Sequence, residues 1–297
     1  MNAPVMFNRR LRKNEISDWL NLIEEHTESG CADRNLAHSY LQLPEAIAFV
    51  SSINEEIIGG TAIYRDRTRL GMVLSSVAIN RKYRDTSAYH IIKTSLPFMK
   101  TVAIRDVDAI VANAPLRRGF GFPASFGLDS WLERILDKIG FVSVGKISSY
   151  TLEQDSSTMR ISDEKKWDTQ PNIQGAKQLI WSMCKVEGLA TSAIWNALDF
   201  AISRGVLKTY SVGGSTQIVT SIDHIGHASL LGLVVIDSEY SMNDAALQIA
   251  SELHREHRPM IHFPLIGENQ CALVEMLSEQ LGGSLKEQTM TLMRKYL

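Results

Sequence analysis

The sequence has few cysteines and no long apolar run. Its three cysteines, Cys31, Cys184 and Cys271, lie far apart in 297 residues. An odd number at this spacing argues against a disulfide framework and favours a reducing compartment. No uncharged apolar stretch approaches the ~20 residues of a membrane span, and the first residues lack the apolar core of a signal peptide. We therefore expect a cytoplasmic protein that acts away from membranes.

An excess of charge of either sign is also missing. The formal net charge is −2, which supplies no general attraction to nucleic acid, so no nucleic-acid partner is expected. The histidines His254, His257 and His262 have no carboxylate or cysteine at metal-ligand spacing, and no metal site is expected. At 297 residues the chain is long enough for two domains of ~150 residues.

Helix-like and strand-like patterns alternate in the first half. Apolar residues at Ile16, Trp19, Leu20 and Ile23 recur at the spacing of an amphipathic helix. Further helices are expected at residues 87–103 and 130–139. Strands are expected at residues 46–53, 57–64, 72–79, 108–113 and 141–152.

The second half repeats this order of elements. Strands are expected at residues 207–212, 217–223, 228–236, 260–265 and 284–293, with helices between and before them. Val77-x-Ile79-x-x-x-Tyr83 recurs as Val234-x-Ile236-x-x-x-Tyr240 at the same strand-to-helix junction. We interpret this as duplication and divergence. The expected domains are residues 1–154 and 171–297, joined by a polar linker at 155–170.

Two segments of the first half resemble the GNAT superfamily of N-acetyltransferases. One is Val77-Ala78-Ile79-Asn80-Arg81-Lys82-Tyr83-Arg84-Asp85-Thr86-Ser87, similar to the family's acyl-CoA-binding segment. The other is Leu136-Asp137-Lys138-Ile139-Gly140-Phe141, similar to its later helix-to-strand junction. The resemblance implies an α/β protein with two GNAT folds in tandem, each a mixed, mostly antiparallel sheet flanked by helices.

The same resemblance implies acetyl-CoA, or another acyl-CoA, as cofactor. Free N–H groups at a helix N-terminus attract a pyrophosphate, and Arg84 could add a charge-assisted hydrogen bond. Asp85 would repel phosphate unless it points outward, and Tyr89 stands where the family has a glycine. Arg84 to Ser87 could equally cap an ordinary helix. The implied cofactor contacts are Val77, Ala78, Ile79, Arg84, Asp85, Thr86, Ser87, Ala88, Tyr89 and Asn113.

The catalytic groups of the family are harder to find. Leu136 stands where the family often has a tyrosine acid, and residues 73–76 contain no carboxylate for a base. Ser75 could hold a water in place of that base and is the candidate catalytic residue. The loop at 115–127, with Arg117 and Arg118, is hypothesised to gate the substrate pocket or to contact the adenosine 3′-phosphate.

The second half departs further from the family pattern. Its equivalent loop contains Asp237, Glu239 and Asp244 but no arginine or glycine, so a pyrophosphate would be repelled. We therefore expect a degenerate GNAT-like domain that serves as a lid, a substrate platform or a packing partner.

The favoured function is transfer of an acetyl group from acetyl-CoA to the amine of a small molecule or peptide, performed in the first half. One alternative is a non-catalytic acyl-CoA-binding or interaction protein on the same fold. Another is an acyltransferase that uses a different acyl donor, such as a longer acyl-CoA or an aminoacyl-tRNA. The sequence leaves the oligomeric state open.

Overall fold

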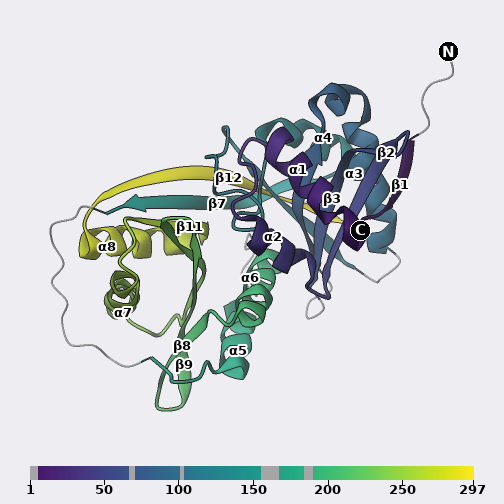
Figure 1. The fold of residues 1–297 in the computed structure, drawn as a ribbon. Coiled ribbons are helices and arrows are strands. Elements are labelled where there is room, and N and C mark those ends of the chain that lie inside the picture. The colour runs from purple at the N-terminus through teal and green to yellow at the C-terminus, as the bar shows by residue number, and fades with distance from the viewer. Residues whose placement is uncertain (1–5, 67–70, 101–103, 155–166, 184–189) are drawn as a thin grey trace. The chain divides into compact units, whose positions relative to one another are not determined.

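The computed structural model describes residues 6–66, 71–100, 104–154, 167–183 and 190–297, so most of the linker expected at 155–170 lies outside the described residues. Two compact units are present (Figure 1). Unit 1 comprises Met1–Gly145 and Met290–Leu297, and unit 2 comprises Lys146–Thr289. None of the described helices has the length and apolar character needed to cross a lipid bilayer.

Unit 1 is built on a mixed sheet with the strand order β1-β2-β3-β4-β5-β12, in which only β4 and β5 are parallel neighbours along this path. Its strands are β1 (Met6–Arg10), β2 (Ala46–Ile53), β3 (Glu56–Asp66), β4 (Gly71–Ile79), β5 (Asp106–Ala112), the short β6 (Gly127–Leu128) and part of β12 (Ser284–Tyr296). Its α-helices are α1 (Ile16–His26), α2 (Arg34–Leu41), α3 (Arg84–Lys100) and α4 (Glu133–Ile139).

Helices α1 and α3 cover opposite faces of the unit 1 sheet. A Cβ at Gly59 would lie 2.9 Å from Ile91 of α3, and one at Gly60 would lie 2.9 Å from Trp19 of α1. Consecutive strand residues point to opposite faces, so the two helices lie on opposite sides. The absence of side chains at this glycine pair allows both helices to pack closely against β3.

Unit 2 has the strand order β7-β11-β10-β9-β8, and only β10 and β11 are parallel. Its strands are most of β7 (Val142–Glu153), β8 (Leu207–Val212), β9 (Ser215–Ile225), β10 (Ala228–Ile236), β11 (Met260–Gly267) and the first part of β12. Its α-helices are α5 (Ile173–Met183), α6 (Thr191–Arg204), α7 (Met242–Arg255) and α8 (Cys271–Leu281).

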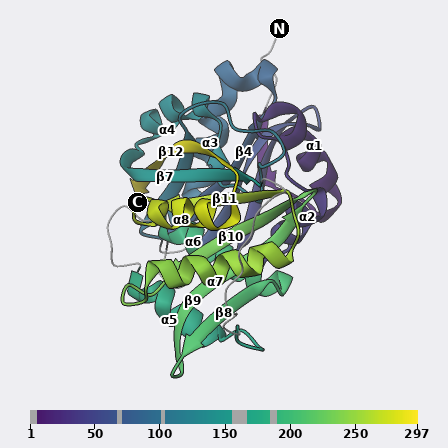
Figure 2. The same ribbon diagram turned by 90° about the vertical axis from the view of Figure 1, so that its left-hand side faces the viewer.

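The helices of unit 2 also form two layers. Val234 packs in a core with α7 and α8, whereas its neighbour Val235 packs in a core with α5 and α6. The two pairs of helices therefore cover opposite faces of the sheet. Figure 2 shows α7 and α8 side by side in front of the strands.

Both sheets contain the same break in parallel pairing. In unit 1 the pairing of β4 with β5 ends at Val73 and Asp108. In unit 2 the pairing of β10 with β11 ends at Leu230 and His262. Beyond these points the two central strands of each sheet separate.

Each break is followed by a β-bulge at the equivalent residue. The register with the neighbouring antiparallel strand shifts around Ser75 in β4 and around Gly232 in β10. Each bulge lies two residues before the apolar pair that defines the repeat, which begins at Val77 in unit 1 and Val234 in unit 2. The repeat inferred from the sequence thus has an equivalent backbone geometry in both units.

The last strand of each half lies in the other unit. Strand β7 follows α4 in the chain but pairs with β11, where Thr151 is opposite His262. Strand β12 follows α8 but pairs with β5, where Arg294 is opposite Asp108. The units therefore differ from the contiguous ranges 1–154 and 171–297 expected from the sequence, because local pattern does not distinguish between two equivalent sheet edges.

Most expected elements are present with boundaries close to those predicted. Strands β2, β8 and β10 have the predicted bounds, and α1 buries the predicted Ile16, Trp19, Leu20 and Ile23. Helix α3 starts three residues earlier than expected, at Arg84. Strands β1 and β6 and helix α2 were not predicted, since all three are short and have no clear period.

Candidate functional site

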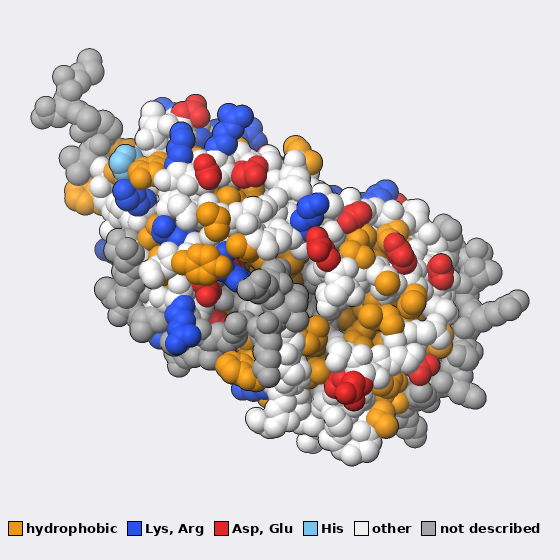
Figure 3. Space-filling model, turned by 180° about the vertical axis from the view of Figure 1, so that it is seen from behind, with side chains coloured by type: hydrophobic (Ala, Val, Ile, Leu, Met, Phe, Trp, Pro, Cys, Tyr) orange, Lys and Arg blue, Asp and Glu red, His pale blue; other side chains and the backbone are white. Residues whose placement is uncertain are grey.

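Charge does not mark a binding surface on the face drawn in Figure 3. Charged side chains of both signs are scattered there among apolar and neutral ones. The centre of each sheet is a better candidate for a binding site, because a pair of parallel strands separates there. The space between the separated strands differs between the two units.

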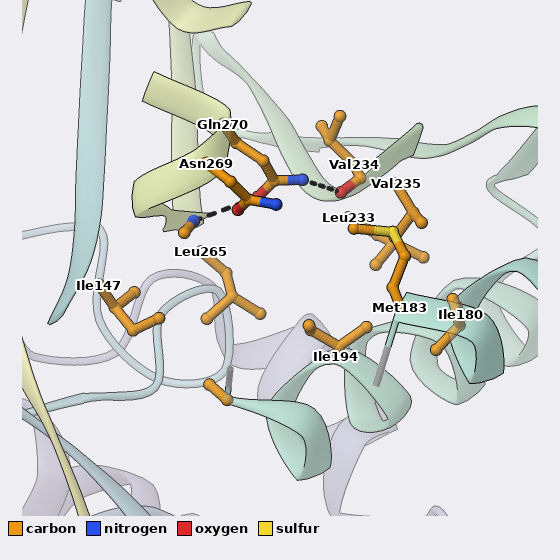
Figure 4. A pocket seen from close by; sticks show the side chains of 12 residues that line it. Ile147, Ile180, Met183, Ile194, Leu233, Val234, Val235, Leu265, Asn269 and Gln270 are labelled. Atoms are coloured by element: carbon orange, nitrogen blue, oxygen red, sulfur yellow. Dashed lines mark hydrogen bonds between the residues drawn. The ribbon is translucent and has the colours of Figure 1, made fainter. Parts of the chain in front are cut away.

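In unit 2 the separating strands line a pocket (Figure 4), which encloses about 490 Å³ of atom-free space, part of it open to solvent. Leu233 and Val235 line it from β10, Leu265 from β11, and Ile180 and Ile194 from α5 and α6. The polar side chains at its rim are Asn269 and Gln270, at the turn that leads into α8. Its mostly apolar walls, with a few polar groups among them, are typical of small-molecule sites.

The loop that joins β10 to α7 is unfavourable for a phosphate or a nucleotide. Asp237 and Glu239 place negative charge there, and no lysine or arginine lies between Ile236 and Arg255. The N–H of Glu239 donates to Asp237 Oδ1 (2.9 Å), and the N–H of Asp244 donates to Ser241 Oγ (3.3 Å). Two backbone donors at this helix start are therefore already used within the loop.

In unit 1 the equivalent space is filled by the chain itself. Ile110 and Val111 of β5 pair with β12 on one edge and, in parallel, with β6 on the other. Because β12 occupies the outer edge, β6 must lie on the edge that faces β4. What remains is a smaller pocket of about 250 Å³, lined by Ser75, Ser76 and Val77 on one side and by Gly127 and Leu128 on the other.

Arg84, expected to bind the pyrophosphate, is held by groups of unit 1. Its guanidinium lies 3.8 Å from Asp129, donates to the carbonyl of His26 and stacks 4.7 Å from the Trp131 ring centroid. Asp129 is 3% exposed and accepts hydrogen bonds from the Glu28 N–H and Trp131 Nε1. Burial raises the pKa of Asp129 and lowers the pKa of Arg84.

Ser75, the candidate catalytic residue, lies at the β4 bulge and is 1% exposed. Its hydroxyl forms a 2.5 Å hydrogen bond with the hydroxyl of Tyr40, which comes from α2 and is fully buried. Tyr40 in turn packs edge-on against Phe122, with ring centroids 4.9 Å apart. The structure thus joins Ser75 to a buried tyrosine that the sequence pattern did not single out.

The other expected cofactor contacts are spread over three parts of unit 1. Val77, Ala78 and Ile79 are buried in β4, with Thr61, Gly60 and Gly59 opposite them in β3. The first turns of α3 contain Asp85, Thr86, Ser87, Ala88 and Tyr89.

Three of these contacts already have partners or lie in the core. Ala88 is 1% exposed, and the Tyr89 hydroxyl accepts a hydrogen bond from Lys93 (3.1 Å). Asn113 lies just beyond β5 and accepts a hydrogen bond from Thr291 (2.8 Å). Strand β6 lies beside β5 in this region, and coenzyme A binding by these residues remains a prediction.

The loop at 115–127 is attached to the segment after α1. The Gly119 N–H donates to the Ser29 carbonyl, and the Ala32 N–H donates to the Phe122 carbonyl (both 3.0 Å). Arg118 donates to Glu24 Oε1 at 2.9 Å. The loop thus brings β6 into the sheet and holds it there, and the 3′-phosphate contact hypothesised for its arginines remains a prediction.

The structure of the chain is similar to known proteins, whereas its sequence is not. The sequence matches no family model and no curated protein. A tandem GNAT protein from the clavulanic acid biosynthesis pathway superposes with a TM-score of 0.67 at 11% identity, over 98% of both chains. The chain has a tandem GNAT fold. A GCN5-related N-acetyltransferase from Sphaerobacter thermophilus gives a TM-score of 0.64 at 12% identity, over 98% of this chain and 95% of that one.

Within this tandem GNAT fold, sequence reasoning missed the open pocket of unit 2. One signal was available, namely the length of chain between the second central strand and the following helix. In unit 2, β11 ends at Gly267 and the turn into α8 begins at once. In unit 1, 17 residues lie between Ala112 and Ser130, enough to return a strand to the sheet.

Proposed function

We propose that the protein is an N-acyltransferase whose acyl donor is an acyl-coenzyme A held in unit 2. The observation that carries this proposal is the mostly apolar pocket between the separated strands β10 and β11. It is supported by the fold, since one superposing protein is a GCN5-related N-acetyltransferase and another is a tandem GNAT protein. The proposal places the donor site in unit 2 and not, as the sequence suggested, at Arg84.

The backbone and side-chain groups that line the pocket support this assignment. A separated strand presents backbone N–H and C=O groups that can pair with the amides of a pantetheine arm. Leu233, Val235 and Leu265 would surround the arm with apolar surface. When bound, the donor supplies a thioester, which is an activated acyl group with a thiolate leaving group.

Positioning would account for much of the rate. Among the described residues that line the pocket there is no carboxylate and no tyrosine. Holding an amine against a fixed thioester lowers the barrier through orientation alone. We propose acetyl-CoA as the first donor to test and a small-molecule or peptide amine as acceptor, with Asn269 as a polar contact at the rim.

Calorimetric titration of acetyl-CoA tests the location of the donor site. Ile194→Trp would place an indole in the pocket, whereas Ile202→Trp alters a half-buried residue two turns along the same helix, outside the pocket lining. Binding that Ile194→Trp abolishes and Ile202→Trp preserves supports the proposal. Equal binding by the wild type and both variants would place the donor elsewhere.

Two observations favour a non-catalytic role for unit 1. Strand β6 and the contacts of Arg84 fill the space that a donor would need there. Unit 1 would then serve as a structural or acceptor-binding partner. An acetyl-transfer assay over a panel of amines tests whether the whole protein is catalytic, because a non-catalytic protein gives no turnover with any acceptor.

A further inference from the structure

The side chain of Gln270 bridges the two separated strands of unit 2. Its Nε2 donates to the carbonyl of Val234 in β10 (2.7 Å), and its Oε1 accepts from the N–H of Gly267 in β11 (3.1 Å), as Figure 4 shows. Val234 lies four residues beyond Leu230, where the parallel pairing ends. One side-chain amide thus donates to β10 and accepts from the end of β11.

The carbonyl of Val234 is the strand acceptor to which a ligand amide in this pocket would donate a hydrogen bond. Val234 lines the pocket and faces Thr220 of β9 across the antiparallel pairing. Its carbonyl points toward the space between β10 and β11, since it accepts from a side chain located there. An amide of a pantetheine arm is the same kind of donor as the Gln270 carboxamide, so both cannot use this acceptor well at once.

Gln270 is able to leave this position. It is only partly buried, at the turn before α8, and its side chain has several rotatable bonds. The hydrogen bonds it makes are neutral ones, whose net contribution is modest because water or a ligand can replace them. The bridge is therefore a reversible substitute for a ligand amide.

We propose that the Gln270 carboxamide occupies the position of a donor amide at the Val234 carbonyl and is displaced when a pantetheine thioester binds. This inference rests on the proposed donor site in unit 2. It makes Gln270 a determinant of donor affinity that acts by competition. It also assigns the ligand chemistry, namely a chain whose amide N–H can replace that of Gln270.

The test compares the wild type with Gln270→Met, which keeps the length of the side chain but can no longer form these hydrogen bonds. Gln280→Met is the matched control, because it makes the same change near the end of α8, outside the pocket lining. Acetyl-CoA and S-acetylpantetheine are titrated into each protein by calorimetry. In parallel, the Gln270 side-chain amide is followed by NMR in uniformly ¹⁵N-labelled wild type and assigned by its absence from Gln270→Met.

Competition predicts that Gln270→Met binds S-acetylpantetheine about fivefold more tightly than the wild type, the size of a typical net hydrogen-bond effect. The control should bind like the wild type, and the Gln270 amide signal should shift during the titration. Donor binding that leaves this signal unmoved, or that Gln270→Met weakens, would overturn the inference and leave the donor site standing. Absence of binding to all three proteins would overturn the proposed site and the inference together.

Discussion

Arg294 donates two hydrogen bonds to Asp108, at 2.6 Å from Nε and 3.0 Å from Nη2, although 186 positions separate them in the chain. Asp108 is completely buried in β5, at the residue where the parallel pairing with β4 ends. The positive guanidinium and the negative carboxylate neutralise each other, so the pair adds no net charge to the core. The pair also joins β12, the last strand of the chain, to the central strand of unit 1.

Removal of the guanidinium should destabilise unit 1. Arg294→Met leaves the buried Asp108 carboxylate without its bidentate partner, and breaking a buried pair in this way costs ~3–5 kcal/mol. Urea unfolding followed by circular dichroism measures the loss. Arg9→Met, which breaks the partly exposed pair with Glu15, is the control and should cost ~1 kcal/mol or less. Similar losses in the two variants would contradict the argument.

A fragment that ends at residue 154 should not fold independently. It lacks residues 290–297, so the outer edge of β5 is unpaired and Asp108 is left without Arg294. We expect poor dispersion in its ¹H–¹⁵N correlation spectrum. A chimaera in which residues 1–145 are joined to residues 290–297 by a flexible linker should give dispersed signals. A well-folded fragment 1–154 would show that β12 is dispensable.

Asp129 should make stability depend on pH between its unfolded and folded pKa values. Burial raises its pKa in the folded state above the ordinary 3.8, so the folded state binds the proton more tightly. The contribution of Asp129 to unfolding free energy is therefore greatest below pH 3.8, falls as pH rises toward the raised value, and is constant above it. Comparing the wild type with Asp129→Asn by urea unfolding at several pH values checks this. A difference that grows in favour of the wild type with rising pH would have the wrong sign.

Donor binding should be insensitive to Arg84 and to the nucleotide of coenzyme A. Arg84 is engaged by Asp129 and the His26 carbonyl, and the loop before α7 carries acids and no cation. Arg84→Ala should therefore change acetyl-CoA affinity by less than about twofold, as expected for a site that makes no ion pair with the phosphates. S-Acetylpantetheine should bind within about threefold of acetyl-CoA for the same reason. A tenfold loss with either change would restore the loop of unit 1 as the donor site.

Much of the architecture could be predicted from periodicity alone. Apolar runs bounded by turn residues predicted β2, β8 and β10, and the helical spacing of Ile16, Trp19, Leu20 and Ile23 predicted the buried face of α1, because local sequence encodes both signals directly. The repeated pattern that begins at Val77 and again at Val234 lies in the strand that contains the bulge in each unit. Short elements without a period, such as α2 and β6, were missed. Because α2 was not predicted, Tyr40, the hydrogen-bond partner of Ser75, was not identified either.

The candidate site was less predictable, because it depends on which space remains open. Arg84 has the residue type and position that phosphate binding requires, yet the fold brings Asp129 and Trp131 against it from 45 and 47 positions later. Gln270 has no motif that would single it out. Its role follows only from the positions of the Val234 carbonyl and the Gly267 N–H.

The sequence by itself determined the kinds of element, their order and the duplication, because these depend on side-chain periodicity within a few residues. Tertiary structure alone decided which edge strand completes which sheet and which of the two central openings is filled. Strands β7 and β12 each follow the last helix of one half, and local sequence does not choose between β5 and β11 as their partner. That choice depends on long-range contacts such as Arg294 with Asp108, and the filling of unit 1 depends on where β6 pairs in three dimensions.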